Sequence, residues 1–383
     1  MGKILNNTRQ KNLFQVETQD DGRTGIEQEE VIGEEITSPF DPTLIQVTTK
    51  FMTIDLLINR IKDGSFDLNP SFQRKEGIWT DAAQSRLIES LLIRIPIPAF
   101  YVDATEEDKW LIVDGLQRLT TLKRFVIDKK LKLSGLEFLT QLDGYGYEDL
   151  NPAFKRRIME TQMVIYKIEY GTPPDVKFNI FKRINTGGLP LSAQEIRHAL
   201  NQGESTEFLA RLAKSKEFET AHNKSIKDKR MADQECVLRF IAFTLTPYIE
   251  YKGDLDYFLS EAMSKMNKMS YDQLDEFEQK FYKAMIVAYK IFGKYAFRKM
   301  HNRARKSLIN KALFETWAVN LGNLSDYESD VLVKKKDIIV DKFIDLMKMS
   351  DFNDAVSQGT GDIKRVNLRF REVKRIIDEV LSS

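Results

Sequence analysis

Apolar and polar residues alternate with two different periods in the first half of the chain, which predicts both helices and strands. Residues 53–61 and 81–93 have apolar side chains three or four positions apart, the spacing of an amphipathic helix. Short apolar runs bounded by polar, glycine or proline positions indicate strands at 99–102, 110–114 and 162–169. This half is therefore expected to be a mixed α/β domain.

The second half has a different pattern. After about residue 203 prolines nearly vanish, Pro247 being the exception, and apolar residues recur with the helical period of 3.6. The segments concerned are 235–246, 271–292, 307–321, 334–347 and 368–381. We therefore predict an α+β protein with an N-terminal mixed domain over 42–203 and an all-α helical domain over 204–383.

Residues 1–41 are expected to be an acidic, disordered arm, because carboxylates crowd together there with few apolar partners. The acidic residues are Glu17, Asp20, Asp21, Glu27, Glu29, Glu30, Glu34 and Glu35. Two interpretations stay open. The arm is either a solvated tail without a task, or an acidic mimic that screens a basic groove elsewhere in the chain.

Composition narrows the class of protein. The chain has 383 residues with 58 basic and 57 acidic side chains, so nucleic-acid affinity has to come from local patches. The single cysteine, Cys236, excludes a disulfide framework and a cysteine zinc site. No secretory signal is visible at the N-terminus, and no apolar run approaches the ~20 residues of a membrane helix. We expect a cytoplasmic protein.

The first candidate site is the corner Asp114-Gly-Leu-Gln-Arg118. A strand ends at Asp114, Gly115 allows a sharp turn, and a helix is expected from Leu116 to about Lys130. The start of such a helix binds anions, and Arg118 could grip phosphate with two hydrogen bonds. Gln117 and the hydroxyls of Thr120 and Thr121 add polar groups. The alternative is an ordinary corner in which Arg118 forms a structural salt bridge.

Three further segments carry candidate chemistry. Arg74 follows an extended proline segment, and Trp79 after it is either a stacking surface or a packing residue. Arg183 and Asn185 precede the glycines of a turn that suits a ligand loop but lacks the Walker lysine. The alternative is a flexible interhelix turn with a C-cap glycine. A basic stretch that could follow a nucleic-acid backbone, or simply form a solvated helix face, contains Arg298, Lys299, Arg303, Arg305 and Lys306.

The same segments, taken in order, resemble a known family. They are Phe72–Arg74 with Trp79, Leu87–Pro98, Val113–Leu122 and Phe181–Gly188. Together they are similar to the N-terminal domain of GmrSD-type restriction proteins, whose DGQQR motif belongs to the ParB/sulfiredoxin-like superfamily. The resemblance covers about residues 45–200 and implies a ParB-like fold with a nucleotide-binding groove.

The resemblance also implies roles for individual residues. The family motif positions are occupied by Arg74, Asp114, Gly115, Gln117, Arg118 and Asn185. Relatives couple binding or hydrolysis of an NTP, with Mg²⁺ as a candidate cofactor, to cleavage of modified or phage DNA. Leu116 replaces the first glutamine of DGQQR, and the three histidines of the chain do not provide the HNH nuclease domain usual in these proteins.

Three functions follow as expectations. The leading one is an NTP-binding and NTP-hydrolysing module of a DNA-targeting defence system, with Asp114 and Arg118 as catalytic residues and a nuclease or other defence protein as partner. The second is a non-catalytic nucleotide- or DNA-binding switch. The third is a ParB-like DNA nuclease, although neither a carboxylate cluster for two metals nor an HNH histidine pair is visible.

Overall fold

The computed structural model describes residues 25–27, 44–68, 79–106, 108–184, 191–227, 230–302 and 307–383. They form two compact units, each with its own hydrophobic core. The first unit ends at Leu191, and the second contains the chain from Ser192 onward together with Gly25–Glu27. The division falls earlier than the boundary expected after residue 203, since α6 (Ala193–Leu200) packs on α9 (Ala232–Leu245) of the second unit.

The first unit is built on a mixed sheet with the strand order β1-β5-β3-β4-β2. Its strands are β1 (Val47–Thr53), β2 (Phe66–Asp67), β3 (Phe100–Asp103), β4 (Trp110–Asp114) and β5 (Gln162–Ile168). The pairs β1–β5 and β3–β4 are antiparallel, whereas β3–β5 and β2–β4 are parallel. β3, β4 and β5 lie where the apolar runs predicted strands.

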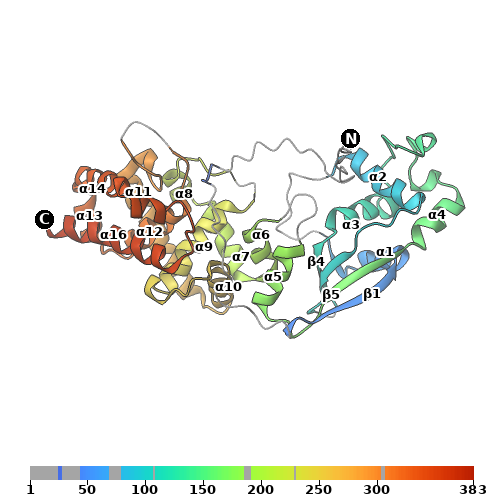
Figure 1. Ribbon diagram of the computed structural model, residues 1–383, viewed down its shortest axis with the longest axis horizontal. Coiled ribbons are helices and arrows are strands. Elements are labelled where there is room, and N and C mark those ends of the chain that lie inside the picture. The colour runs from blue at the N-terminus through green and yellow to red at the C-terminus, as the bar shows by residue number, and fades with distance from the viewer. Residues whose placement is uncertain are drawn as a thin grey trace, which may run out of the picture. The chain divides into compact units, whose positions relative to one another are not determined.

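Helices cover one face of this sheet (Figure 1). They are α1 (Ile54–Lys62), α2 (Asp81–Leu92) and α3 (Leu116–Leu122), which continues as a π-helical turn at Lys123–Ile127; α4 (Pro152–Met159) and α5 (Pro174–Ile184) complete the unit. Thr53 and Thr80 are the N-caps of α1 and α2. The side-chain oxygen of each accepts the backbone N–H of the residue three positions later, which is Leu56 for Thr53 and Ala83 for Thr80. Phe100, Ile112 and Ile165 from the sheet are buried under these helices.

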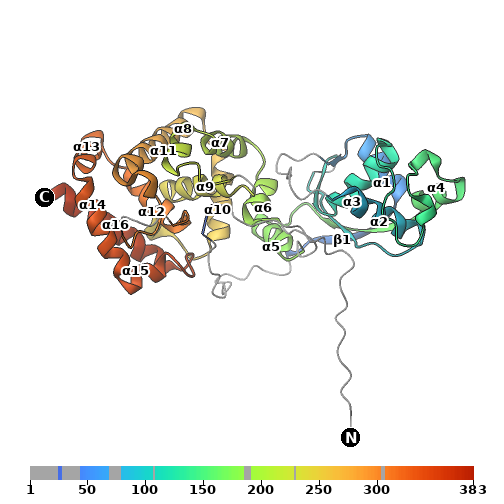
Figure 2. The same cartoon turned by 90° about the horizontal axis from the view of Figure 1, so that it is seen from above.

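The second unit is all helical among its described residues apart from short bridges and turns, so the α+β class is confirmed (Figure 2). Beyond α6 and α9 its helices are α7 (Glu204–Ala213), α8 (Lys216–Ala221), α10 (Leu255–Met266), α11 (Tyr271–Phe292), α12 (Lys311–Gly322), α13 (Asp326–Lys334), α14 (Lys336–Lys348), α15 (Ser350–Ala355) and α16 (Ile363–Ser382). α12 is central and packs against α9, α11 and α16. Cys236 is fully buried on α9, and burial raises the pKa of its thiol to about 12, as expected for a core cysteine.

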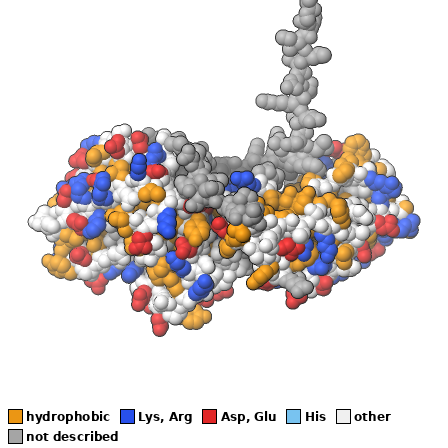
Figure 3. All heavy atoms as spheres, turned by 60° about the horizontal axis from the view of Figure 1, so that its bottom comes forward, with side chains coloured by type: hydrophobic (Ala, Val, Ile, Leu, Met, Phe, Trp, Pro, Cys, Tyr) orange, Lys and Arg blue, Asp and Glu red, His pale blue; other side chains and the backbone are white. Residues whose placement is uncertain are grey.

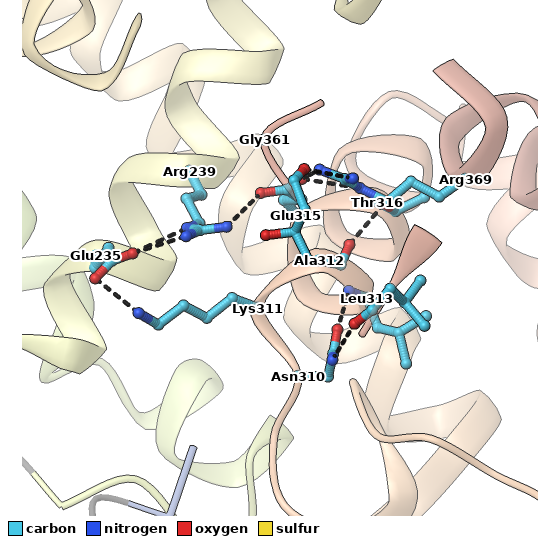
Figure 4. A network of polar contacts seen from close by, with 12 residues as sticks. Glu235, Arg239, Asn310, Lys311, Ala312, Leu313, Glu315, Thr316, Gly361 and Arg369 are labelled. Atoms are coloured by element: carbon cyan, nitrogen blue, oxygen red, sulfur yellow. Dashed lines mark hydrogen bonds and ion pairs between the residues drawn. The ribbon is translucent and has the colours of Figure 1, made fainter. Parts of the chain in front are cut away.

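A buried network of ion pairs connects α9, α12 and α16 (Figure 4). Glu315 of α12 is 0% exposed and accepts hydrogen bonds from Arg239 of α9 and Arg369 of α16. Arg239 also donates to Glu235 at 2.9 Å, and Glu235 in turn accepts from Lys311 at 2.8 Å. Buried charges persist only when they are paired, so the network fixes how the three helices meet.

The outer surface carries no strong bias of charge where it can be seen. On the face shown in Figure 3, Lys and Arg side chains are interspersed with Asp and Glu. This agrees with a formal net charge of +1 for the whole chain.

Candidate functional site

The end of β4 has an irregular pairing that decides where Asp114 points. Tyr101 of β3 pairs with Asp114, and Val102 pairs with Ile112, so Val113 is an extra residue on β4. A bulge of this kind shifts the alternation of side chains between the two faces of a sheet. Asp114 therefore lies on the face of Tyr101, opposite to the face where Ile112 is covered by helices.

Two tyrosines extend this face across the sheet. Tyr101 pairs directly with Tyr166 of β5, and their rings stack with centroids 4.8 Å apart and planes inclined by 25°. Both rings are half-buried, as is Asp114. Burial raises the pKa of Tyr101, and the neighbouring Tyr166 and Asp114 raise it further. We call this set the Asp114–Tyr101–Tyr166 row.

Arg118 contacts the row at Asp114, and its guanidinium donates hydrogen bonds to other groups of the protein. Its side chain is 8% exposed and donates from Nη2 to Oδ2 of Asp114 at 2.7 Å. Nη1 donates to the carbonyl oxygens of Pro98 and of Ala99, the latter at 3.2 Å. The guanidinium also lies 4.7 Å from the centre of the Phe100 ring. Arg118 thus joins the segment before β3 to the end of β4.

This geometry changes the role expected for Arg118. Burial lowers the pKa of Arg118 and raises the pKa of Asp114, while the attraction between the two opposes both shifts. Two of the three guanidinium nitrogens donate to groups of the protein. A direct grip on phosphate is therefore not what the geometry favours, and Arg118 acts as a positioning residue that orients Asp114.

Gly115 has two structural reasons to be glycine. Its φ is +101°, a left-handed conformation that side chains rarely adopt. A Cβ atom at this position would lie 2.2 Å from Cδ1 of Phe100. The close approach expected for a ligand is thus made here by the Phe100 ring. The backbone N–H of Gly115 donates to the Asp114 carboxylate and favours its charged form.

The polar side chains of α3 are partly used inside the fold. Oε1 of Gln117 accepts the backbone N–H of Trp79 at 3.3 Å, which holds the chain before α2 at this corner. Thr121 is 0% exposed and donates to the carbonyl oxygen of Gln117 at 2.7 Å, so its hydroxyl does not serve as the phosphate donor that we expected. Thr120 is half-buried and stays a candidate.

The other predicted ligands are not brought to the corner by the described contacts. Arg74 and Asn185 lie outside the described residues. Arg183 is exposed at the end of α5, and among the described residues no hydrogen bond or ion pair joins it to Asp114. The anchor of α5 is Lys177, whose Nζ lies 3.0 Å from Oδ2 of Asp103 at the end of β3.

The basic stretch of the helical unit also differs from the expectation. Arg298 is 2% exposed and donates to Lys294 O at 3.1 Å, to Ser225 Oγ at 2.7 Å and to two further carbonyl oxygens. Burial lowers its pKa to about 10. It is a structural residue and not the DNA contact that we expected. Lys299 forms an ion pair with Glu27, and the remaining predicted contacts, Arg303, Arg305 and Lys306, lie outside the described residues.

Sequence reasoning missed Tyr101 and Tyr166. The apolar run 99–102 gave the strand, but the register that stacks the two rings is a tertiary feature. The signal available was the presence of one tyrosine in each of two predicted strands.

One comparison with known proteins finds a family whose model matches much of the first unit. The family model of the GmrSD restriction endonuclease, N-terminal domain, matches residues 54–202, a range that contains the corner, α3, β5 and α5. A search of curated proteins found no match. Among the described residues, no helix combines the length and apolar character that crossing a membrane requires.

Proposed function

We propose that this chain binds a nucleoside triphosphate and thereby controls a DNA restriction activity, because residues 54–202 match the family model of the GmrSD restriction endonuclease, N-terminal domain. The observation that supports the proposal most directly is the Asp114–Tyr101–Tyr166 row. Its carboxylate has a perturbed pKa, is 30% exposed and stands at a bulge, features that recur at functional sites.

The chemistry of the row suits the nucleoside end of the ligand. An ionised carboxylate only accepts hydrogen bonds, so Asp114 would receive a ribose hydroxyl or an amino group of the base. The tyrosine rings offer a π surface on which a base can stack. Phosphates need donors, and the candidates near the corner are the amide nitrogen of Gln117 and the hydroxyl of Thr120, with Arg74 and Asn185 as motif positions.

A protein-held Mg²⁺ does not fit the described corner. Arg118 lies 2.7 Å from the Asp114 carboxylate and already neutralises it, which disfavours a second cation at the same oxygen atoms. Any Mg²⁺ would therefore arrive with the phosphates of the nucleotide. The catalytic role expected for Asp114 does not depend on a metal at this carboxylate.

A specific observation favours a second candidate, the non-catalytic switch. Stabilisation of a phosphoryl transition state needs cationic donors aimed at the phosphate. The Arg118 donors are instead occupied by Asp114, Pro98 and Ala99. Binding without turnover needs only the row and the phosphate donors. Phosphate release in the presence of each NTP and Mg²⁺ separates hydrolysis from switching, and a plasmid-nicking assay tests the nuclease alternative.

The test is a calorimetric titration of the full chain with the four NTPs and with inorganic triphosphate. Wild type should bind at least one NTP, and Tyr101→Leu and Asp114→Asn should weaken that binding about tenfold or more. Tyr170→Leu and Asp55→Asn, which alter exposed side chains of the same unit, are the matched controls. Circular dichroism confirms folding. The proposal fails if wild type binds no NTP, or if the row variants bind as tightly as the controls.

A further inference from the structure

Three residues of the acidic arm are docked on the helical unit. Ile26 forms a parallel β-bridge with Ile309, in which Glu27 N donates to Ile309 O at 2.8 Å and Ile309 N donates to Gly25 O at 3.1 Å. Ile309 is also bridged to Arg298 on its other side. The arm thus adds a short strand to the edge of this pair, a common way of binding an extended peptide.

The position at which Gly25–Glu27 dock on the helical unit requires these particular residues. Ile26 is 6% exposed and belongs to the hydrophobic core of the helical unit. Gly25 has a φ of +81°, and a Cβ atom there would lie 1.8 Å from the carbonyl oxygen of Ser225. Only glycine fits before the buried isoleucine, so docking of Gly25–Glu27 depends on this local sequence.

The carboxylate of Glu27 occupies a set of convergent donors. Its Oε1 accepts from Nζ of Lys299 at 2.6 Å and its Oε2 accepts from Nδ2 of Asn310 at 3.1 Å. The donors are themselves fixed. Lys299 Nζ also contacts Ser357 Oγ at 2.7 Å, and Asn310, which is 3% exposed, caps α12 by accepting Leu313 N at 2.9 Å.

We propose that Lys299 and Asn310 form a binding site for a phosphate group of a nucleic-acid backbone, and that Glu27 covers this site while the arm is docked. A carboxylate and a phosphate diester both present anionic oxygen acceptors, for which an ammonium and an amide N–H are suitable donors. The arm is then an intramolecular competitor of nucleic acid.

The competition follows from charge. Each phosphate contact by a cation releases counterions and contributes to affinity in a salt-dependent way. With Glu27 in place, the positive charge of Lys299 is cancelled at 2.6 Å, and the acidic residues that follow in the sequence repel a polyanion. Release of the arm exposes the ammonium, so nucleic-acid affinity and arm docking must change in opposite directions.

The experiment compares three full-length variants with wild type by fluorescence anisotropy on a short labelled DNA duplex over a series of salt concentrations. Gly25→Ala removes docking by adding one methyl group, Glu27→Gln removes the carboxylate charge, and Gly25→Ala/Lys299→Gln removes the exposed cation as well. Gly293→Ala is the matched control, because Gly293 has a φ of +54° and free space around its missing Cβ. Hydrogen exchange at Ile309 N–H reports docking directly.

The expected result has three parts. Gly25→Ala exchanges faster at Ile309 and binds DNA several-fold more tightly, and the slope of log affinity against log salt becomes steeper by about one phosphate contact, near 0.9. Glu27→Gln shows a smaller gain of the same sign. The Lys299→Gln change cancels the gain. The proposal is overturned if Ile309 exchanges faster while DNA affinity stays at the wild-type level, or if neither Gly25→Ala nor Glu27→Gln raises DNA affinity.

Discussion

Glu315 is a residue at which a substitution of nearly the same shape should strongly lower the free energy of unfolding of the helical unit. We consider Glu315→Gln, which exchanges one carboxylate oxygen for an amide nitrogen. In the fold, Oε2 accepts from Arg239 Nη1 at 3.2 Å, and Oε1 accepts from Arg369 Nε at 3.1 Å and from its Nη2 (Figure 4). Glutamine offers one acceptor oxygen and turns a donor toward the other arginine.

The magnitude follows from burial. Glu315 and Arg369 are each 0% exposed and Arg239 is 2% exposed, so water cannot replace the lost carboxylate. Removing one partner of a buried ion pair costs about 3–5 kcal/mol. Here one carboxylate serves two guanidinium groups, and we expect the upper part of that range. Against a typical total of about 5–15 kcal/mol, the helical unit would lose a large share of its stability.

The assay is urea unfolding of the full chain, since urea leaves charge interactions unscreened, with hydrogen exchange of α9, α12 and α16 peptides to assign the transition to the helical unit. Glu276→Gln is the matched control: it makes the same change at an exposed residue of α11 and should shift stability by no more than about 0.5 kcal/mol. Replacing Glu315, Arg239 and Arg369 together by methionine should recover much of the loss. A cost below about 1 kcal/mol for Glu315→Gln would refute the reasoning.

Two further predictions concern the sheet unit. The Glu89 carboxylate accepts hydrogen bonds from the backbone N–H groups of residues 137–139 at 3.0, 2.7 and 2.7 Å. Burial acts to raise the pKa of Glu89, but these hydrogen bonds outweigh burial and hold the pKa below its ordinary value of 4.5. The Glu89 carboxylate therefore contributes fully to the free energy of unfolding above pH 4.5, and this contribution is lost on acidification. We expect Glu89→Gln to be less stable than wild type by about 2–3 kcal/mol at pH 7. This difference should narrow in unfolding curves measured at lower pH. Gly115→Ala should cost about 2–4 kcal/mol, because it adds a clash with Phe100 to left-handed strain. Gly144→Ala, at a φ of +86° with open space around it, should show the strain alone, and equal thermal shifts would show that the clash is absent.

The elements that the sequence predicted best are those whose apolar residues are buried in the hydrophobic core. α2 and the strands β3, β4 and β5 follow apolar patterns that burial explains. β1 was not predicted, because its first five residues are all exposed and the alternation that marks a half-buried strand is missing. It is held by its pairing with β5, a partner more than a hundred positions away, which local pattern cannot show.

The sequence predicted that Asp114 ends a strand and that Arg118 lies in the helix that follows, and the structure confirms both placements. The chemistry of the residue types then predicted that the Arg118 guanidinium contacts phosphate, which differs from the contacts that it makes in the fold. Its actual acceptors include the carbonyl oxygens of Pro98 and Ala99, groups that every residue has and no sequence pattern marks. The same limit applies to Arg298, whose four acceptors come from three separate segments of the helical unit.

The bulge in β4 shows why these roles depend on tertiary structure. Strict alternation from Trp110 and Ile112 would place Asp114 on the face covered by α1 to α3, where an ionised carboxylate would be costly among apolar groups. The extra residue, Val113, moves the carboxylate to the other face, and Arg118 reaches it there from one turn along α3. Asp114, the bulge and Arg118 therefore form one device. Changing Arg118 should disturb the position of Asp114 first, and the proposed nucleotide binding only as a consequence.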